Sequence, residues 1–488
     1  MPQFDELLAE SHRRGIRVIM DLVINHTSDE HPWFVESRSS KDNPKRDYYI
    51  WRPGKNGLEP NNWESIFGGS AWQLDEATGE YYMHLFSVKQ PDLNWENADV
   101  RRELYDMINW WLDKGIDGFR VDAITHVKKI KSLPDLPNQD RKRYVPSWDG
   151  HRNREGLLDY LRELKAETFA KYDIMTVGEA NGVELTQAED FVGEAAGVFN
   201  MIFQFEHMTI DQGPGGKWNL RPDWKLSELK EILSRWQTGH EGRGWNALFL
   251  ENHDVPRSVS RFGNDRDYHA ASAKMLATCY MLMQGMPYIY QGQEIGMTNV
   301  RFDSLEQYRD VEIMNWFREG AAAGLSKSEL LEPVYAQGRD NARTPMQWNG
   351  GKHAGFSQAE PWIEVNPNYV DINVERQLQD PHSILQYYKK LIRLRASELA
   401  AIYGSYELLL PEDERVYAYL RTLGEEKLLV LCSFCEHIAA ICLPEEVAKS
   451  RSLLLLGNVK PAERITEDDA LGGSLALQPY EARVYKLV

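Results

Sequence analysis

Charged and polar side chains follow several apolar runs of this sequence. In DGFRVDAITH, residues 117–126, Arg120 and Asp122 come at the end of one such run. Other runs end in the following residues: Asp21, Asn25 and His26; Glu179; and Asn252, His253 and Asp254. A buried carboxylate is costly unless it is paired or takes part in chemistry. Gathered in one pocket, three carboxylates, two histidines and an arginine would suit nucleophilic and acid–base catalysis.

Each of these residues also has a structural explanation. A single aspartate at the end of a strand is more often a cap or one half of an ion pair than a catalytic group. His26 alone is more often a hydrogen-bonded core histidine. The case for chemistry rests on the number of such residues, because each structural explanation would have to apply separately.

A pair of carboxylates at neighbouring strand ends indicates glycoside chemistry. In retaining glycosidases one carboxylate is the nucleophile and the other is first an acid and then a base. Four aromatic residues between residues 27 and 97 could offer flat surfaces for sugar rings, or could form the core of a small domain: Trp63, Phe67, Trp72 and Phe86.

The elements that must position these groups alternate between strands and helices. Apolar runs typical of strands buried on both faces cover residues 16–26, 115–124, 173–180, 197–206, 244–254 and 286–296. Helical stripes such as Leu157, Leu161 and Leu164 separate them. This repetition predicts a parallel α/β fold. In a (β/α)8 TIM barrel, the C-terminal ends of the strands meet at one face, which carries the active site.

Two regions interrupt this alternation. Residues 27–97 are rich in Trp, Tyr, Gly, Pro and Asn and show little helical period, which predicts an inserted small domain. Residues 404–488 contain short alternating segments that predict a C-terminal antiparallel β domain. Residues 1–26 and 98–403 would then form the barrel.

Composition excludes several partners. The net charge of −18 opposes nucleic acid and anionic membranes and suits a neutral substrate. No apolar run reaches the roughly 18 residues that cross a bilayer. Cys432 and Cys435 form a lone CxxC that favours core thiols over a zinc site. Few cysteines and no signal peptide predict a cytoplasmic location.

Ordered motifs add a resemblance to a known family. The sequence resembles glycoside hydrolase family 13, the α-amylase superfamily, and within it the oligo-1,6-glucosidase and α-glucosidase group. The segments that carry the resemblance are DLVINH (21–26), QPDLN (90–94), GFRVDAI (118–124), VGEA (177–180), ENHD (251–254), FGNDRDYHAASAKMLAT (262–278) and RDNARTPMQW (339–348).

The resemblance implies a role for each matching residue. Asp122 matches the nucleophile that forms a covalent glucosyl-enzyme, Glu179 the general acid/base, and Asp254 the third carboxylate that favours the distorted transition state. The residues that match substrate-binding or nucleophile-orienting positions are His26, Arg120, His253 and Arg343. Asp21, at its strand end, and Phe86, in the aromatic insert, complete the predicted substrate-binding set. The substrate would be a small oligosaccharide, and the oligomeric state stays open.

The start of the chain departs from the family pattern. Family members begin with a strand, a helix and a second strand before the helix that opens this chain, and many carry a metal-binding loop there. We therefore expect an N-terminally incomplete barrel with no metal site and no cofactor. The chain would be either a fragment, including a reading frame begun at an internal methionine, or a genuinely short protein. Expressed alone, it is expected to be poorly folded or inactive.

Linkage preference is left open by two opposing signals. QPDLN is typical of oligo-1,6-glucosidases, but Ala123 stands where enzymes that prefer α-1,6 bonds usually carry valine. After the acid/base, the chain has ANGV (180–183), including Asn181, where isomaltose-cleaving members typically carry an MPGV-like stretch. A smaller side chain at position 123 would widen the pocket and admit α-1,4-linked sugars. We expect an exo-acting α-glucosidase on short oligosaccharides.

Three other readings compete with this one. Trehalose-6-phosphate hydrolases and sucrose-isomerising enzymes resemble the same group, although VRFDSLEQYRD (300–310) departs from the arginine-rich loop of the isomerases. A non-catalytic relative would have lost its carboxylates, whereas this chain keeps all three.

Overall fold

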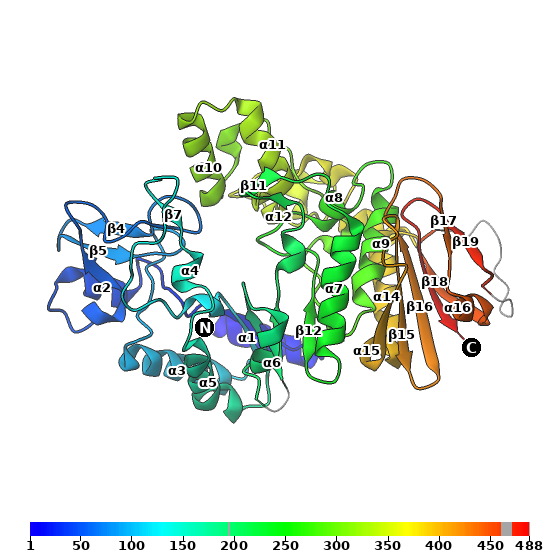
Figure 1. Ribbon diagram of the computed structural model, residues 1–488, viewed down its shortest axis with the longest axis horizontal. Coiled ribbons are helices and arrows are strands. Elements are labelled where there is room, and N and C mark those ends of the chain that lie inside the picture. The colour runs from blue at the N-terminus through cyan, green and yellow to red at the C-terminus, as the bar shows by residue number, and fades with distance from the viewer. Residues whose placement is uncertain (194–195, 460–470, 488) are drawn as a thin grey trace. The chain divides into compact units, whose positions relative to one another are not determined.

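The computed structural model describes residues 1–193, 196–459 and 471–487. Its contacts divide the chain into two compact units. The first contains residues 1–205 and 243–245, and the second contains residues 206–242 and 246–488. Figure 1 labels many of the elements of both. Within the described residues, no helix is both long and apolar enough to cross a membrane.

A parallel ladder of four strands forms the centre of the first unit. The strands are β1 (Ile19–Leu22), β6 (Gly118–Val121), β8 (Met175–Glu179) and β9 (Met201–Phe203). Phe119, Val121 and Val177 are buried, as expected for strands covered on both faces. The predicted parallel strands are thus present here, although they are shorter than the apolar runs that predicted them.

Helices connect successive strands of this ladder. They are α3 (Ala98–Asp113), α5 (Leu157–Glu167) and α6 (Leu185–Val192), and α1 (Pro2–Arg13) precedes β1 (Figure 1). In α3, Leu104, Ile108 and Leu112 recur every four residues and are buried, so one face packs inward. The Asn97 side chain accepts a hydrogen bond from the backbone of Asp99 and caps the first turn.

The predicted insert contains its own antiparallel sheet. Its strands are β2 (Trp51–Pro53), β5 (Glu80–Met83) and β4 (Trp72–Asp75), in that order, and α2 (Pro32–Ser39) precedes them. Trp63 and Trp72 are buried in a core that also includes Leu133. β3 (Trp63–Glu64) pairs with β7 (Val145–Pro146), so a segment beyond residue 97 packs here too.

The second unit contains helices and a large C-terminal sheet. The elements before this sheet that concern the site are β12 (Trp245–Leu248), β13 (Met286–Pro287), α10 (Val311–Ala322) and α12 (Asp340–Arg343). Ala247 and Leu248 of β12 pair in parallel with β13. The apolar run 286–296 was predicted to be a strand throughout, but only its first two residues are. Gly292 and Gly296 adopt left-handed conformations on either side of a short 3-10 helix, so the last part of the run is not extended.

The C-terminal sheet is antiparallel, as predicted. Its strands run in the order β14 (Ser405–Leu409), β15 (Val416–Leu423), β16 (Glu426–Ser433), β20 (Ala482–Leu487) and β18 (Ser452–Gly457) (Figure 1). The Tyr419 hydroxyl donates to the carbonyl of Cys279 in α9 (His269–Met281), which fastens that helix to the sheet. All four cysteines are free thiols in the described residues.

The contact between β6 and β8 requires glycine at position 118. Gly118 has a φ of 144°, and a Cβ atom there would lie 1.7 Å from the carbonyl oxygen of Met175. We expect Gly118→Ala to cost roughly 3 kcal/mol or more in the free energy of unfolding, because it adds a backbone clash to a left-handed strain. Urea denaturation would measure this loss.

Gly115→Ala is the matched control. Gly115 also has a positive φ, 99°, but the nearest atom to its added Cβ would lie 3.9 Å away. It should cost only about 1 kcal/mol. Equal shifts of the two denaturation midpoints would contradict the clash.

Candidate active site

Arg120 joins three carboxylates in the first unit. Its Nη1 atom donates to Asp122 Oδ1 at 2.6 Å and to Asp21 Oδ1 at 2.8 Å. Its Nη2 atom donates to Glu179 Oε2 at 2.7 Å. The backbone N–H of Ala123 donates to the same Glu179 oxygen at 3.0 Å. The structure therefore brings these four charged residues into contact within this unit.

Strand register brings these side chains together. Asp21 of β1 lies opposite Arg120 of β6, and Arg120 lies opposite Val177 of β8. Glu179 is the last residue of β8, two residues after Val177, so its side chain leaves the same face of the sheet. Parallel pairing thus places one residue from each of three strand ends around a single guanidinium group.

The electrostatics of this cluster favour a charged arginine. Burial lowers the pKa of Arg120, but Glu179, Asp122 and Asp21 more than offset it and raise that pKa above its usual range. The side chains of Asp122 and Glu179 remain 20% and 19% exposed, so both carboxylates can be reached from solvent. A substrate could therefore meet two carboxylates that one cation holds in place.

His26 lies beside an aromatic ring in the same unit. Its Nε2 atom is 2.9 Å from Gln90 Nε2, and its Nδ1 atom is 3.3 Å from Asn25 Nδ2. The rings of His26 and Phe86 are 5.1 Å apart. Burial lowers the pKa of His26, although Asp92 partly opposes that effect.

The four predicted aromatic surfaces divide into two groups. Trp63 and Trp72 are buried, and their indole N–H groups donate to Pro134 and Asn61, so they belong to the core. Phe67 and Phe86 are half-buried and lie 5.6 Å apart. Only this second pair keeps surface that a sugar could contact.

His126 also lies beside Phe86. The sequence did not single it out, although it is the last residue of the stretch DGFRVDAITH. Its ring meets Phe86 edge-on at 5.9 Å, and its Nδ1 atom lies 2.9 Å from Nδ1 of His151. Burial lowers the pKa of His126 to about 3. The sequence around His126 gives no sign of this contact, because His151 is distant in the sequence.

Hydrogen bonding fixes the tautomer of His126. The Ser147 hydroxyl donates its one proton to the carbonyl of Glu64, so it accepts from His151 Nε2, which lies 3.1 Å away. Burial lowers the pKa of His151, and the neutral ring therefore accepts at Nδ1. His126 must then donate from Nδ1, which leaves its Nε2 atom unprotonated.

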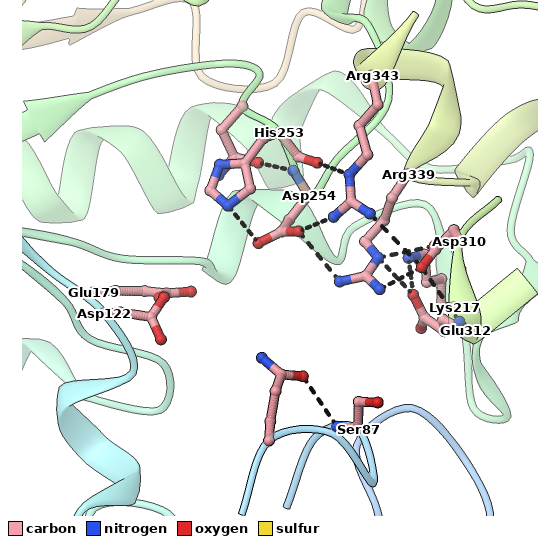
Figure 2. A network of polar contacts seen from close by, with 12 residues as sticks. Ser87, Asp122, Glu179, Lys217, His253, Asp254, Asp310, Glu312, Arg339 and Arg343 are labelled. Carbon is pink, nitrogen blue, oxygen red and sulfur yellow. Dashed lines mark hydrogen bonds and ion pairs between the residues drawn. The ribbon is translucent and has the colours of Figure 1, made fainter. Parts of the chain in front are cut away.

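A second charged cluster lies in the second unit, after β12. The carboxylate of Asp254 accepts from Arg343 Nη2 at 2.8 Å and from Arg339 Nη1 at 3.2 Å, both at Oδ1 (Figure 2). Oδ2 lies 3.1 Å from His253 Nε2. The side chain of Asn252 accepts from the backbone N–H of Asp254 at 2.7 Å and shapes the turn.

This cluster contains the predicted residues His253, Asp254 and Arg343, and it adds Arg339. Desolvation raises the pKa of Asp254, but the hydrogen bond from His253 and the charges of both arginines outweigh it and hold that pKa below its usual range. Arg339 begins the quoted segment RDNARTPMQW, but nothing in the sequence distinguished it from a surface arginine. Because Asp254 belongs to one unit and Asp122 with Glu179 to the other, each cluster stands on its own contacts.

No group of three or more His, Cys, Asp or Glu side chains suited to hold a metal ion occurs within residues 1–193, 196–459 and 471–487.

Comparison with known proteins places the chain among carbohydrate-active enzymes. Residues 1–404 match a family model described as the α-amylase catalytic domain. The chain is 54% identical to an oligo-1,6-glucosidase of Parageobacillus thermoglucosidasius over 490 residues, which cover 100% of this chain and 86% of that protein. It is 45% identical to a trehalose-6-phosphate hydrolase of Bacillus subtilis strain 168 over 491 residues, which cover 100% of this chain and 85% of that protein.

Solved structures agree with these similarities. The isomaltulose synthase of Klebsiella sp. LX3 gives a TM-score of 0.92 at 41% identity, covering 100% of this chain and 86% of that one. The trehalose-6-phosphate hydrolase of Bacillus licheniformis gives 0.89 at 44% identity with the same coverage. Likeness of this degree shows a TIM-barrel fold with a C-terminal antiparallel β domain.

Stability should depend on pH through His126. An unfolded histidine titrates near 6.5, whereas His126 in the folded protein titrates at about 3. Between these values only the unfolded state binds the proton, so stability falls as pH drops through this window, by at most about 1.4 kcal/mol per pH unit from this residue. We expect His126→Asn, whose amide can replace Nδ1, to lose stability less steeply than the unsubstituted protein between pH 6.5 and 5. Urea denaturation at each pH would measure it.

The control is His437→Asn, which removes an exposed histidine. It should keep the pH dependence of the unsubstituted protein. If His126→Asn also kept that dependence, the buried neutral state of His126 would be wrong.

Proposed function

This chain belongs to the α-amylase family, and we propose that it is a retaining, exo-acting α-glucosidase that removes the non-reducing terminal glucose from short α-linked oligosaccharides, in the manner of an oligo-1,6-glucosidase. The observation that carries the proposal is the shared contact of Asp122 and Glu179 with Arg120. Two carboxylates at adjacent strand ends supply the nucleophile and the acid/base that retention requires. The net charge of −18 is compatible with a neutral sugar.

Asp122 is the proposed nucleophile. The hydrogen bond from Arg120 holds its carboxylate in place. A carboxylate oxygen attacks the anomeric carbon while the glycosidic C–O bond breaks, and Glu179 gives its proton to the leaving oxygen. Glu179 then takes a proton from water, which attacks the same carbon and releases Asp122. Two inversions leave the product with the α configuration of the substrate.

Glu179 needs both protonation states during this cycle. Its contacts with Arg120 and the N–H of Ala123 favour the carboxylate, which is the form that the second step uses. The first step needs the acid, so substrate binding has to weaken these contacts. In this proposal Arg120 therefore orients both carboxylates and also sets the ease with which Glu179 gains its proton.

The other predicted residues join the proposal through their motifs. We assign Asp254 as the third carboxylate and His26, His253 and Arg343 as ligands of sugar hydroxyls. Phe86 is assigned as an apolar surface for the sugar, and its contact with His26 supports this role. Asp21 is assigned as a further polar ligand, and its side chain is 54% exposed beside Arg120.

The domain boundaries and location belong to the same proposal. We infer a barrel of residues 1–26 and 98–403, an insert of residues 27–97 and a C-terminal domain of residues 404–488. The separate antiparallel sheets support the last two. A cytoplasmic location is supported by the four free thiols of the described chain.

The first test is release of glucose from isomaltose, maltose and trehalose 6-phosphate by the purified chain. If the chain folds when it is expressed alone, contrary to the expectation from its sequence, it should hydrolyse isomaltose, and NMR of the first product should show α-glucose. Asp122→Asn should reduce kcat by about four orders of magnitude or more, because it removes the nucleophile. Glu179→Gln should reduce it by roughly 10²- to 10⁴-fold, because it removes the proton donor and acceptor.

Asp159→Asn is the control, since Asp159 lies on the exposed face of α5. It should leave the rate unchanged. Preference for maltose over isomaltose would indicate the wider pocket expected from Ala123. Preference for trehalose 6-phosphate, or β-glucose as the first product, would overturn the proposal.

We also propose that hydrolysis needs no bound metal ion. Arg120 already supplies the cation that lies between the two carboxylates. Dialysis against a chelator should leave kcat and KM within about twofold, because a guanidinium group cannot be removed by chelation. A loss of activity that added calcium or magnesium restores would show that a metal takes part.

A further inference from the structure

The guanidinium group of Arg339 donates hydrogen bonds to the carboxylates of Asp254 and Asp310 in the second unit. Its Nε atom donates to Asp310 Oδ2 at 2.9 Å, and its Nη2 atom donates to Asp310 Oδ1 at 2.5 Å. The remaining nitrogen, Nη1, donates to Asp254 Oδ1 at 3.2 Å. Two of the three nitrogens are thus fixed by Asp310, and the third is aimed at Asp254 (Figure 2).

Asp310 is itself held firmly. It is the N-cap of α10, where its side chain accepts from the backbone of Glu312 at 3.2 Å. The buried Asp340 accepts from the backbone N–H groups of Arg309 and Asp310 at 2.7 Å and 3.1 Å. Asp340 follows Arg339 directly. The segment at α12 is therefore joined to the segment before α10 twice, by Arg339 with Asp310 and by the hydrogen bonds that the Asp340 side chain accepts.

The charges around Arg339 are balanced. Three carboxylates, those of Asp254, Asp310 and Glu312, face three cationic groups, those of Arg339, Arg343 and Lys217. Arg339 is the best shielded of these cations at 9% side-chain exposure, compared with 22% for Arg343. Replacing a shielded guanidinium that has three carboxylate neighbours should cost more stability than replacing an exposed one, because the carboxylates are left without a buried partner.

Arg343 and Arg339 therefore differ in what they can do. Arg343 contacts the Asp254 carboxylate and the carbonyl of His253, which are both parts of one short turn. Arg339 hydrogen-bonds Asp310 through a planar fork and Asp254 through its remaining nitrogen, whereas Arg343 reaches Asp310 only in a longer ion pair, with Nη1 3.7 Å from Oδ1. The orientation of the Asp254 carboxylate thus depends on a helix cap that lies 56 positions later in the sequence.

We propose that Arg339 is a positioning residue that sets the orientation of Asp254, and that Asp310 acts on the reaction through Arg339. The segment before α10 then contributes to catalysis although neither Arg339 nor Asp310 contacts the sugar. This inference rests on the proposed function, in which Asp254 stabilises the transition state. A loss of orientation should reduce kcat more than it raises KM, because it weakens an interaction made mainly in the transition state.

The test is a double-mutant cycle of Arg339→Lys and Asp310→Asn, measured by steady-state hydrolysis of isomaltose. Lysine keeps the charge but cannot form the fork. Asparagine keeps the helix cap but loses the charge. We expect each substitution to reduce kcat by about tenfold or more with less than a threefold change in KM. The double variant should be close to the worse single variant, because both changes break one connection.

Arg318→Lys is the matched control. Arg318 lies on the exposed side of the same helix, α10, and should leave both kinetic constants unchanged. Thermal unfolding of each variant separates misfolding from loss of orientation. If Asp310→Asn unfolds, Arg339→Lys still provides the kcat-against-KM comparison.

The outcomes separate this inference from the proposed function. An unsubstituted chain that unfolds cooperatively on heating, and so is folded, but hydrolyses no α-glucoside would overturn the proposed function. An active unsubstituted chain with independent, multiplying effects of the two substitutions would overturn only the role of Arg339. Normal kcat in folded Arg339→Lys would do the same.

Discussion

The ion contacts of Arg120 are the constraint on which the candidate site depends. One guanidinium group touches the carboxylates of Asp21, Asp122 and Glu179, and these come from three different strands. Without a shared cation, three carboxylates at this distance would repel one another and favour protonation. Arg120 therefore lets the chain keep two ionisable acids close together, and this closeness is what retaining glycoside chemistry needs.

The fold serves this contact through strand register. Parallel pairing sets Asp21 opposite Arg120, and the glycine at position 118 lets β6 and β8 approach closely where this pairing begins. A shift of one residue would turn Arg120 to the other face of the sheet. Apolar runs that end in charged residues were informative because the last residues of parallel strands emerge at one edge of the sheet.

Sequence reasoning succeeded where signals were local and failed where partners were distant. The strand-end carboxylates could be predicted because each follows its own apolar run. His126 and Arg339 could not be predicted, because their roles depend on contacts with His151 and Asp310, which no local pattern links to them. Trp63 and Trp72 were grouped with Phe86 by composition, but burial separates them. The strand predicted for residues 286–296 covers only Met286 and Pro287, and the run closes in a short 3-10 helix between two left-handed glycines.

In both charged clusters an arginine side chain contacts several carboxylates, but different elements hold the arginine in place. Arg120 lies within a strand, so the backbone ladder sets its position and all of its partners lie at strand ends. Arg339 lies at the N-terminal end of the short helix α12, where no ladder holds it, and Asp310 fixes it instead. A carboxylate oriented by a strand arginine is as rigid as the sheet. One oriented through a helix cap depends on a loop, and loops tolerate changes that sheets do not. Asp254 is therefore held by a turn and a helix cap, whereas Asp122 and Glu179 are held at the ends of strands.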